Sequence, residues 1–403
     1  MTYAPAGETM TNGAADHAVM RRVNRAVVLD YIRTADSAFS RAAIADATGL
    51  AKPTVGQIVD ELMEAGLVVE SGRGASGTVG GRPPLLLSFN ARSSYIAGVH
   101  VGVRRTTVVI ADALAEPLAS DTIATPRGSA HAALVTIAQA MEKLGARVGA
   151  SSHEAIASVG VCLPGLVDES GQLLFAPNLG WRDVPVADVL TEQLGTQVVA
   201  YNAAHTSLVA ETQLGAAVGE RNAVLVYAGS GVGAAAVVDG RLMRGTSGIA
   251  GEFGHVRVRP DGERCNCGKH GCLETVASAD AVAAAWSGGG RRSATAAEIA
   301  AAAASGDESA REVLAAAGEE LGAASAWLVN LFDPSCLVLA GGLAGAGAPF
   351  VEPFRAALAR DALRESVERV RVVVSALGQE AEVRGALLLA RERASADLRI
   401  VTR

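Results

Sequence analysis

Gly251-Glu-Phe-Gly-His255 and Cys265-Asn-Cys-Gly-Lys-His-Gly-Cys-Leu-Glu274 form the most distinctive pattern in this sequence of 403 residues. Three of its five cysteines fall within eight residues: Cys265, Cys267 and Cys272. Three thiolates and one imidazole can surround zinc tetrahedrally, which leaves no position open for water. The spacing therefore predicts a structural metal site rather than disulfides, with His255 or His270 as the fourth ligand.

The sequence around this pattern indicates an α/β domain with two lobes. From residue 91 to residue 403, valine-rich segments and glycine turns alternate with alanine-rich segments, as strands alternate with helices in such domains. We expect strands within residues 96–112, 156–163, 223–239 and 336–340. Cys162 and Cys336 stand alone in two of these apolar segments, so we expect them to be small core residues.

Residues 18–90 predict a winged helix-turn-helix. Apolar residues at Val23, Val27, Tyr31 and Ile32 indicate a first helix with one buried stripe. Ser40 is expected to cap a short helix that ends at Gly49, and a third helix follows with Pro53 in its first turn. Two strands, residues 67–70 and 85–89, then flank a glycine-rich wing over residues 72–82.

Two short helices joined by a tight turn present the side chains of the second helix to base edges in DNA. We expect DNA contacts from the cap residue, from polar residues of the third helix outside its apolar face, and from one arginine of the wing. These candidate contacts are, in that order, Ser40; Lys52, Thr54 and Gln57; and Arg82. A small helical protein-interaction domain is the alternative. Residues 17–92 carry nine Lys and Arg against seven Asp and Glu, so this prediction rests on the pattern and not on bulk charge.

Composition limits the class of protein and its location. Half of the residues are hydrophobic and the formal net charge is -7, which fits a globular protein. No apolar run is long enough to cross a bilayer, so no membrane partner is expected. Residues 1–17 lack the charge and apolar block of a secretory signal and are expected to be a disordered leader of a cytoplasmic protein.

The cysteine-rich pattern resembles a motif of the ROK family of repressors and sugar kinases. Three further segments resemble motifs of the same family: Leu163-Pro-Gly165, Pro177-Asn-Leu-Gly-Trp181 and Leu339-Ala-Gly-Gly342. The resemblance covers essentially the whole chain once the helix-turn-helix is included. It implies a two-lobed actin/hexokinase-like domain after the winged helix-turn-helix. It also favours His255 over His270 as the zinc ligand, beside the three cysteines.

In ROK sugar kinases, residues at the positions that match Glu252, His255 and Glu274 hydrogen-bond the sugar hydroxyls, together with an Asn-Asp pair upstream. The resemblance therefore implies effector contacts from Asn202, Glu252, His255 and Glu274. Polar side chains on a rigid loop suit such a ligand, because each buried hydroxyl needs a partner. The alternative for the two glutamates is surface charge.

Two departures from the family pattern argue against an enzyme. The kinases carry an aspartate base after the asparagine, whereas this chain has Tyr201-Asn-Ala-Ala-His205, and Ala203 cannot accept a proton. The first phosphate loop, Asp-x-Gly-Gly-Thr in the family, is His100-Val-Gly-Val-Arg104 here. Basic residues in that loop, with Arg105 beside it, suggest an anionic effector as an alternative to a neutral sugar.

The sequence therefore predicts a repressor of carbohydrate-related genes that binds double-stranded operator DNA and responds to a sugar or sugar phosphate. We expect a homodimer or homotetramer, because helix-turn-helix dimers match two-fold symmetric operators. Two alternatives remain. One is a sugar kinase with a DNA-binding appendage, and the other is a constitutive DNA-binding protein whose sensor pocket has decayed.

Overall fold

The structure is a computed structural model that describes residues 12–34, 37–74, 83–150, 156–288 and 294–400. The chain divides into two compact units, each with its own core. Unit 1 contains Met1–Ser94, Asp112–Leu114 and Ala394–Arg403, and unit 2 contains Tyr95–Ala111 and Ala115–Arg393. The division after Ser94 lies close to the domain boundary at residue 90 that the change in composition suggests.

Unit 1 contains three helices in the order expected for a helix-turn-helix: α1 (Asn12–Thr34), α2 (Arg41–Thr48) and α3 (Lys52–Glu64). The Ser40 side chain accepts a hydrogen bond from the Ala43 amide and caps α2, and Gly49 ends that helix with a φ of 70°. Pro53 lies in the first turn of α3, as expected. The tight turn between α2 and α3 is therefore present.

The first helix differs from the expectation. It begins at Asn12, so residues 12–17, expected to belong to a disordered leader, are helical. Its buried face is also different, because Val23 and Val27 are exposed while Val28, Leu29 and Ile32 are buried. A helix turns 100° per residue, so the apolar stripe predicted at Val23 and Val27 is rotated by about one residue from the face that is buried in the structure.

An antiparallel hairpin of β1 (Val68–Arg73) and β2 (Leu85–Phe89) follows the helices. Phe39, just before α2, exchanges two backbone hydrogen bonds with Leu87 and extends this hairpin. Side chains from all five elements form one core that includes Ile32, Ile44, Leu62 and Leu87. The short helix η1 (Ala91–Ser93) follows β2, and most of the predicted wing, including Arg82, lies outside the described residues.

The first lobe of unit 2 is built on a five-stranded sheet in the order β10-β6-β3-β4-β5. Its strands are β3 (Tyr95–Val101), β4 (Arg105–Asp112), β5 (Pro117–Ala124), β6 (Ile156–Leu163) and β10 (Gln197–Asn202). Helices α4 (Ala130–Arg147) and α5 (Val186–Leu194) pack on this sheet through a shared apolar core. A small sheet of β7 (Leu166–Val167), β8 (Leu173–Ala176) and β9 (Trp181–Val184) lies in the same lobe.

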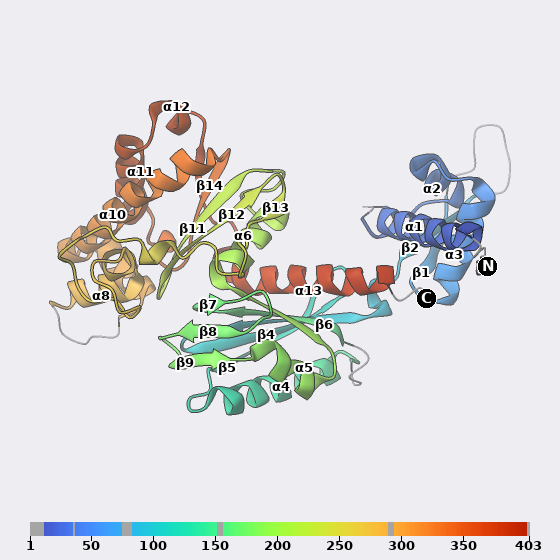
Figure 1. Cartoon of the computed structure of the whole chain (residues 1–403), viewed down its shortest axis with the longest axis horizontal. Helices are drawn as coiled ribbons and strands as arrows, with labels where there is room; N and C mark the ends of the chain where they lie inside the picture. The colour runs from blue at the N-terminus through green and yellow to red at the C-terminus, as the bar shows by residue number, and fades with distance from the viewer. Residues whose placement is uncertain (1–11, 35–36, 75–82, 151–155, 289–293, 401–403) are drawn as a thin grey trace, which may run out of the picture. The chain divides into compact units, whose positions relative to one another are not determined.

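The second lobe has its own five-stranded sheet, in the order β13-β12-β11-β14-β15. The strands are β11 (Ala223–Ala228), β12 (Val232–Val238), β13 (Arg241–Leu242), β14 (Cys336–Ala340) and β15 (Arg371–Val374). Its helical elements are η3 (Phe253–His255), α7 (Glu274–Ala277), α8 (Ala279–Trp286), α9 (Ala296–Ala304), α10 (Glu308–Phe332), η4 (Ala344–Ala346), α11 (Ala348–Asp361), α12 (Arg364–Val367) and η5 (Gly378–Glu380). Figure 1 shows the two sheets as separate lobes, which confirms the predicted α/β architecture.

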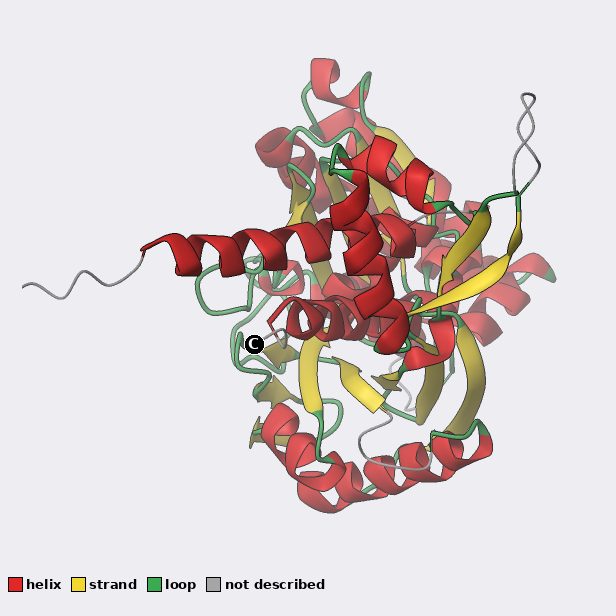
Figure 2. Cartoon of the chain, turned by 90° about the vertical axis from the view of Figure 1, so that its right-hand side faces the viewer, coloured by secondary structure: helices red, strands yellow, loops and turns green. Residues whose placement is uncertain are grey.

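Helices α6 (Ala203–Leu214) and α13 (Ala381–Ile400) pack closely against each other and against the sheets. Gly160 of β6 permits this packing, because a Cβ there would lie 1.9 Å from the carbonyl oxygen of Ala386. Gly385 does the same toward Thr206 of α6. Figure 2 shows how helices (red) cover the strands (yellow). Cys162 in β6 and Cys336 in β14 are buried, as predicted. Among the described residues, no helix is long and apolar enough to cross a membrane.

Candidate effector cavity, metal site and DNA-binding surface

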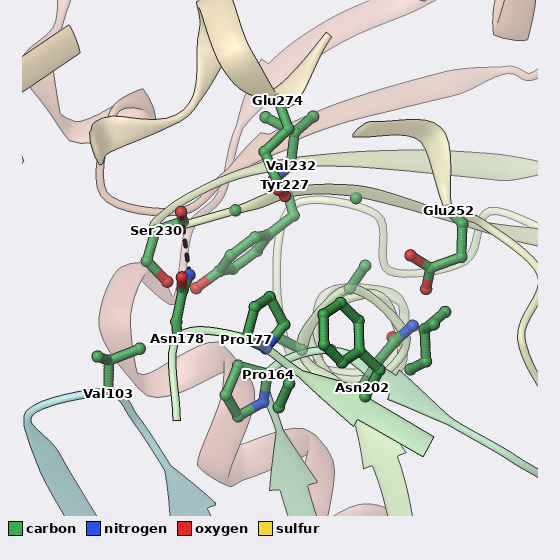
Figure 3. Close-up of a pocket in the computed structure, with 18 of the residues that line it drawn as sticks. Val103, Pro164, Pro177, Asn178, Asn202, Tyr227, Ser230, Val232, Glu252 and Glu274 are labelled. Carbon is green, nitrogen blue, oxygen red and sulfur yellow. Dashed lines mark hydrogen bonds between the residues drawn. The ribbon is translucent and has the colours of Figure 1, made fainter. Parts of the chain in front are cut away.

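A cavity of about 120 Å³ in unit 2 is lined by residues from both lobes. The first lobe contributes the ends of β3, β6, β8 and β10, and the second lobe contributes the β11–β12 turn and the segment from Glu252 to Glu274. The four residues expected to contact an effector all line this cavity: Asn202, Glu252, His255 and Glu274. Figure 3 shows Glu252 and Glu274 above the cavity and Asn202 below Glu252.

Glu274 is held in place by the turn between β11 and β12. Its Oε2 accepts a hydrogen bond of 3.2 Å from the Val232 amide. Gly231 makes room for the carboxylate, because a Cβ at that position would lie 2.8 Å from Glu274 Oε2. The second carboxylate oxygen lies 3.9 Å from Cys265 Sγ, next to the cysteine cluster.

Glu252 is the second carboxylate of the cavity. Burial, with the charge of Glu274 as the smaller cause, raises the pKa of Glu252 to about 7. Its Oε2 lies 3.9 Å from His255 Nε2. Two carboxylates and an imidazole on one wall offer acceptors and a donor for the hydroxyls of a small polar ligand.

Asn202 ends β10 and begins α6. Its Oδ1 accepts a hydrogen bond of 2.9 Å from the His205 amide, so it caps the helix. The side-chain NH₂ group is not used in that cap and has the hydrogen-bond donors that a polar ligand would need. Ala203, the next residue, also lines the cavity and presents a methyl group there.

The segment from His100 to Arg104, which the sequence matched to the first phosphate loop of the kinases, contributes His100, Gly102 and Val103 to another part of the cavity wall. Burial lowers the pKa of His100, although the charge of Glu382 opposes this effect, so the imidazole is neutral at pH 7. Arg104 and Arg105 are exposed and do not line the cavity. The described residues that line the cavity therefore include two glutamates and no lysine or arginine.

Several lining residues were not among the predicted contacts. Asn178 Nδ2 donates to the Ser230 carbonyl at 3.4 Å and links the two lobes across the cavity (Figure 3). Tyr227 lines the cavity and donates a hydrogen bond of 2.8 Å to the buried Glu382 of α13. Asn178 lies in one of the motifs quoted above, which could have indicated it. Tyr227 follows apolar residues in a strand, and only the fold reveals its position.

The cysteine cluster forms a compact set of ligand atoms. One nitrogen of His255 and the sulfurs of Cys265, Cys267 and Cys272 all lie within 4.8 Å of one another. His255 Nδ1 lies 3.6 Å from Cys265 Sγ, and the Cys267 and Cys272 sulfurs lie 3.6 Å apart. Tetrahedral zinc with bonds of about 2.3 Å places its sulfur ligands about 3.8 Å apart, so the set fits such a metal.

His270 does not belong to this set. It is exposed, and its Nδ1 lies 3.3 Å from the Gly262 carbonyl oxygen. The described residues therefore offer His255, and not His270, together with the three cysteines as a group that could hold a metal ion.

On unit 1, Lys52 and Gln57 of α3 are exposed and Thr54 is partly exposed, while Val55 and Ile58 point into the core. The outer face of α3 is thus the polar one. Ser40 is occupied as the cap of α2. Arg82 lies outside the described residues.

Comparison with known protein families agrees with this architecture. Residues 96–393 match the ROK family, and residues 25–72 match the IclR helix-turn-helix domain. The first match covers about three quarters of the chain, from β3 into α13.

Individual relatives include regulators and kinases. The xylose repressor of Caldicellulosiruptor bescii is 27% identical over 93% of this chain and 96% of its own length. A solved ROK family transcriptional regulator, described as a homolog of the Escherichia coli MLC protein, is 26% identical with a TM-score of 0.77 over 94% of this chain and 98% of its own.

A ROK family glucokinase from Streptomyces griseus, solved with glucose and AMPPNP, is 30% identical with a TM-score of 0.65 over 74% of this chain and 100% of its own. The kinase thus matches unit 2, whereas the two regulators also match the helix-turn-helix region. With its two lobes, its cysteine cluster and its matched residues 96–393, this chain belongs to the ROK family.

Proposed function

We propose that this protein is a transcriptional repressor of carbohydrate-related genes, and that a sugar in the cavity of unit 2 controls its binding to operator DNA. One observation carries the proposal. The cavity keeps polar residues suited to a sugar, Asn202, Glu252 and Glu274, but has Ala203 where a kinase needs its base. A site that can bind a sugar without a base to activate it is suited to sensing.

The relatives that match nearly the whole chain support the same function. They are named as a repressor and as a transcriptional regulator, and both include the region of the helix-turn-helix. On unit 1, the polar face of α3 supplies base contacts from Lys52, Thr54 and Gln57 in the major groove. Ser40 and Arg82 complete the proposed DNA contacts.

The charge of the cavity favours a neutral sugar over a sugar phosphate. A phosphate dianion buried beside Glu274 and the partly ionised Glu252 would be repelled, and no lysine or arginine among the described lining residues would compensate its charge. His100 lines the cavity, but its neutral imidazole provides no positive charge at pH 7. We therefore assign the effector contacts of Asn202, Glu252, His255 and Glu274 to the hydroxyls of a neutral sugar.

Sugar kinase activity is the second candidate, because the Streptomyces griseus glucokinase matches unit 2. Ala203 and the changed first phosphate loop argue against it. A coupled assay with ATP and a panel of hexoses separates the two functions. Phosphorylation of any hexose would contradict the proposal that the protein is not an enzyme.

A structural zinc ion is proposed at His255, Cys265, Cys267 and Cys272. The four ligands would complete a tetrahedron, so the metal would stabilise the loop and would not activate water. The zinc would fix the segment that presents Glu252 and Glu274 to the cavity. We further propose that the chain acts as a homodimer or homotetramer, since a two-fold symmetric operator requires two helix-turn-helix units.

Selection of genomic fragments by the purified full-length chain tests the proposed function. The expected result is enrichment of fragments that share a roughly palindromic site, with weaker binding in the presence of a pool of neutral sugars. A pool of sugar phosphates serves as the matched comparison and should have no effect. Enrichment that no pool changes would instead support the decayed sensor, and absence of enrichment would contradict DNA binding.

A further inference from the structure

Another hollow lies on unit 1, between α1 and α3, and has both polar and apolar lining residues. It has a volume of about 200 Å³ and is lined by Met20, Arg21 and Asn24 of α1 and by Thr54, Gln57 and Ile58 of α3. Two of these residues, Thr54 and Gln57, are among the proposed base contacts of α3. The hollow therefore adjoins the face of α3 that would enter the major groove.

The polar side chains of this hollow are all able to donate hydrogen bonds. Arg21 offers a guanidinium, Asn24 and Gln57 offer amide NH₂ groups, and Thr54 offers a hydroxyl. None of the described residues that line the hollow is acidic, although Glu61 of α3 pairs with Arg21. A set of donors with one fixed positive charge is complementary to an oxyanion.

Arg21 is held beside the recognition helix by an ion pair with Glu61 of α3. Its side chain remains 63% exposed, so the pair does not remove it from solvent. A guanidinium has five N–H donors, and a single oxygen of Glu61 leaves others available. Glu61 thus restricts the orientation of Arg21, which lowers the entropy lost when Arg21 binds an anion.

We infer that this hollow binds a phosphate of the DNA backbone, with Arg21 as the principal contact and Asn24 as a second donor. The inference rests on the proposed DNA-binding function and extends it to α1, which the predicted contacts did not include. When a recognition helix lies in the major groove, its neighbouring elements face the phosphates that border the groove. Arg21 would therefore position α3 and would not read the sequence.

The test is the salt dependence of DNA binding by the full-length chain, measured on a selected operator duplex and on a scrambled duplex of equal length. Arg21→Ala should weaken binding to both duplexes, by about tenfold. It should also reduce the slope of log Kobs against log salt by about 0.9, the value for one lost phosphate contact. Arg21→Lys keeps the charge and should keep most of the slope, which excludes a folding defect as the cause.

Two variants serve as controls. Arg22→Ala removes the same charge at the adjacent position of α1, which does not line the hollow, and should leave the slope unchanged. Gln57→Ala should weaken binding to the operator more than to the scrambled duplex. An unchanged slope in Arg21→Ala, a loss confined to the operator, or an equal effect of Arg22→Ala would each overturn the inference. Binding of the wild-type chain to neither duplex would overturn the proposed function itself.

Discussion

Ala203 gives the cavity no group that can accept a proton at this position, and it leaves the neighbouring lining residues in place. The alanine begins α6 immediately after Asn202, whose side chain caps that helix. Because Asn202 makes the cap, the N-terminus of α6 does not require an aspartate at position 203. If Ala203 occupies the position of the kinase base, as we propose, the chain lacks that base but keeps the geometry of the proposed effector contact at Asn202.

His205 lies in the first turn of α6 and is almost completely buried, and its Nε2 has no hydrogen-bond partner among the described residues. Burial, as the main cause, lowers the pKa of His205 to about 4. The positive charge of Arg244 lowers this pKa further, whereas a hydrogen bond with the Ala250 backbone raises it. The imidazole is therefore neutral in the folded chain at pH 5, where a histidine in the unfolded chain is protonated.

This difference predicts a dependence of stability on pH. Between pH 6.5 and pH 4 the unfolded state binds one more proton at His205 than the folded state, so stability falls as the pH is lowered through this window. The contribution of His205 to the free energy of unfolding should fall by about 2 kcal/mol from pH 7 to pH 5.

His205→Asn, which removes the titratable imidazole, should reduce this dependence of stability on pH by about 2 kcal/mol. Urea unfolding of both proteins at pH 5 and pH 7, followed by tryptophan fluorescence, measures it. All three tryptophans, including Trp181, lie in unit 2. An identical pH dependence in both proteins would contradict a neutral, buried His205.

Gly231 gives a second prediction at the scale of one residue. An alanine there would place its Cβ 2.8 Å from Glu274 Oε2 and displace the carboxylate from the Val232 amide. A lost hydrogen bond to a charged group costs about 1.5–3 kcal/mol, so effector affinity should fall by about 10- to 100-fold. Calorimetric titration with the identified sugar measures this change.

Gly345→Ala is the matched control, since a Cβ at Gly345 meets nothing within 4 Å. It should leave effector affinity unchanged. Equal affinities for Gly231→Ala and the wild-type protein would show that the position of Glu274 does not determine effector binding.

At the scale of elements, the loop from Glu252 to Glu274 joins the cysteine cluster to the cavity. His255 belongs to both, because it lines the cavity and lies within the set of metal-ligand atoms. A metal bound to His255 and the three cysteines would restrict the positions of both Glu252 and Glu274. The DNA-binding face of unit 1 contains none of these ligands.

Removal of zinc should therefore weaken the response to the effector more than it weakens DNA binding. His255→Ala should lower the zinc content of the purified protein and should abolish the effect of the sugar on DNA affinity. His270→Ala, a histidine of the same loop outside the ligand set, should keep one zinc per chain and a normal response. Metal analysis measures the zinc content, and DNA-binding titrations with and without sugar measure the sugar response. If folded, zinc-free protein lost DNA binding and sugar response equally, the metal would not act mainly on the effector cavity.

The elements that could be predicted from the sequence are those with local signals at their ends. Ser40 and Gly49 delimit α2 at the predicted residues, because a cap hydrogen bond and a positive φ are local requirements. The start of α1 carried no such signal, and its buried face was assigned to the wrong residues, because tertiary packing decides which apolar side chains are covered.

The same distinction holds for the candidate site. The motifs identified the segment that carries Glu252, His255 and Glu274, and these residues do line one cavity. Tyr227 and His100 could not be assigned with the same precision. Their positions depend on how β11 and β3 meet across the cavity, which is long-range information that no local pattern contains.

At the scale of the whole molecule, one chain combines a unit built to present a recognition helix with a unit built to enclose a small polar ligand. A sugar can regulate DNA binding only through a difference in its affinity for the DNA-bound and DNA-free states. The cavity is lined by both lobes of unit 2, so its occupancy can favour one arrangement of the lobes over another.

The most direct test is the dissociation constant of the full-length chain for a selected operator, measured as one neutral sugar is titrated, with wild-type protein and Glu274→Gln compared. We predict that the sugar weakens DNA binding by at least about tenfold, which corresponds to a coupling free energy of about 1.4 kcal/mol. The variant should bind the operator equally well without sugar but require far more sugar to release it. An operator affinity that no neutral sugar changes, or an identical sugar response in the variant, would contradict the account.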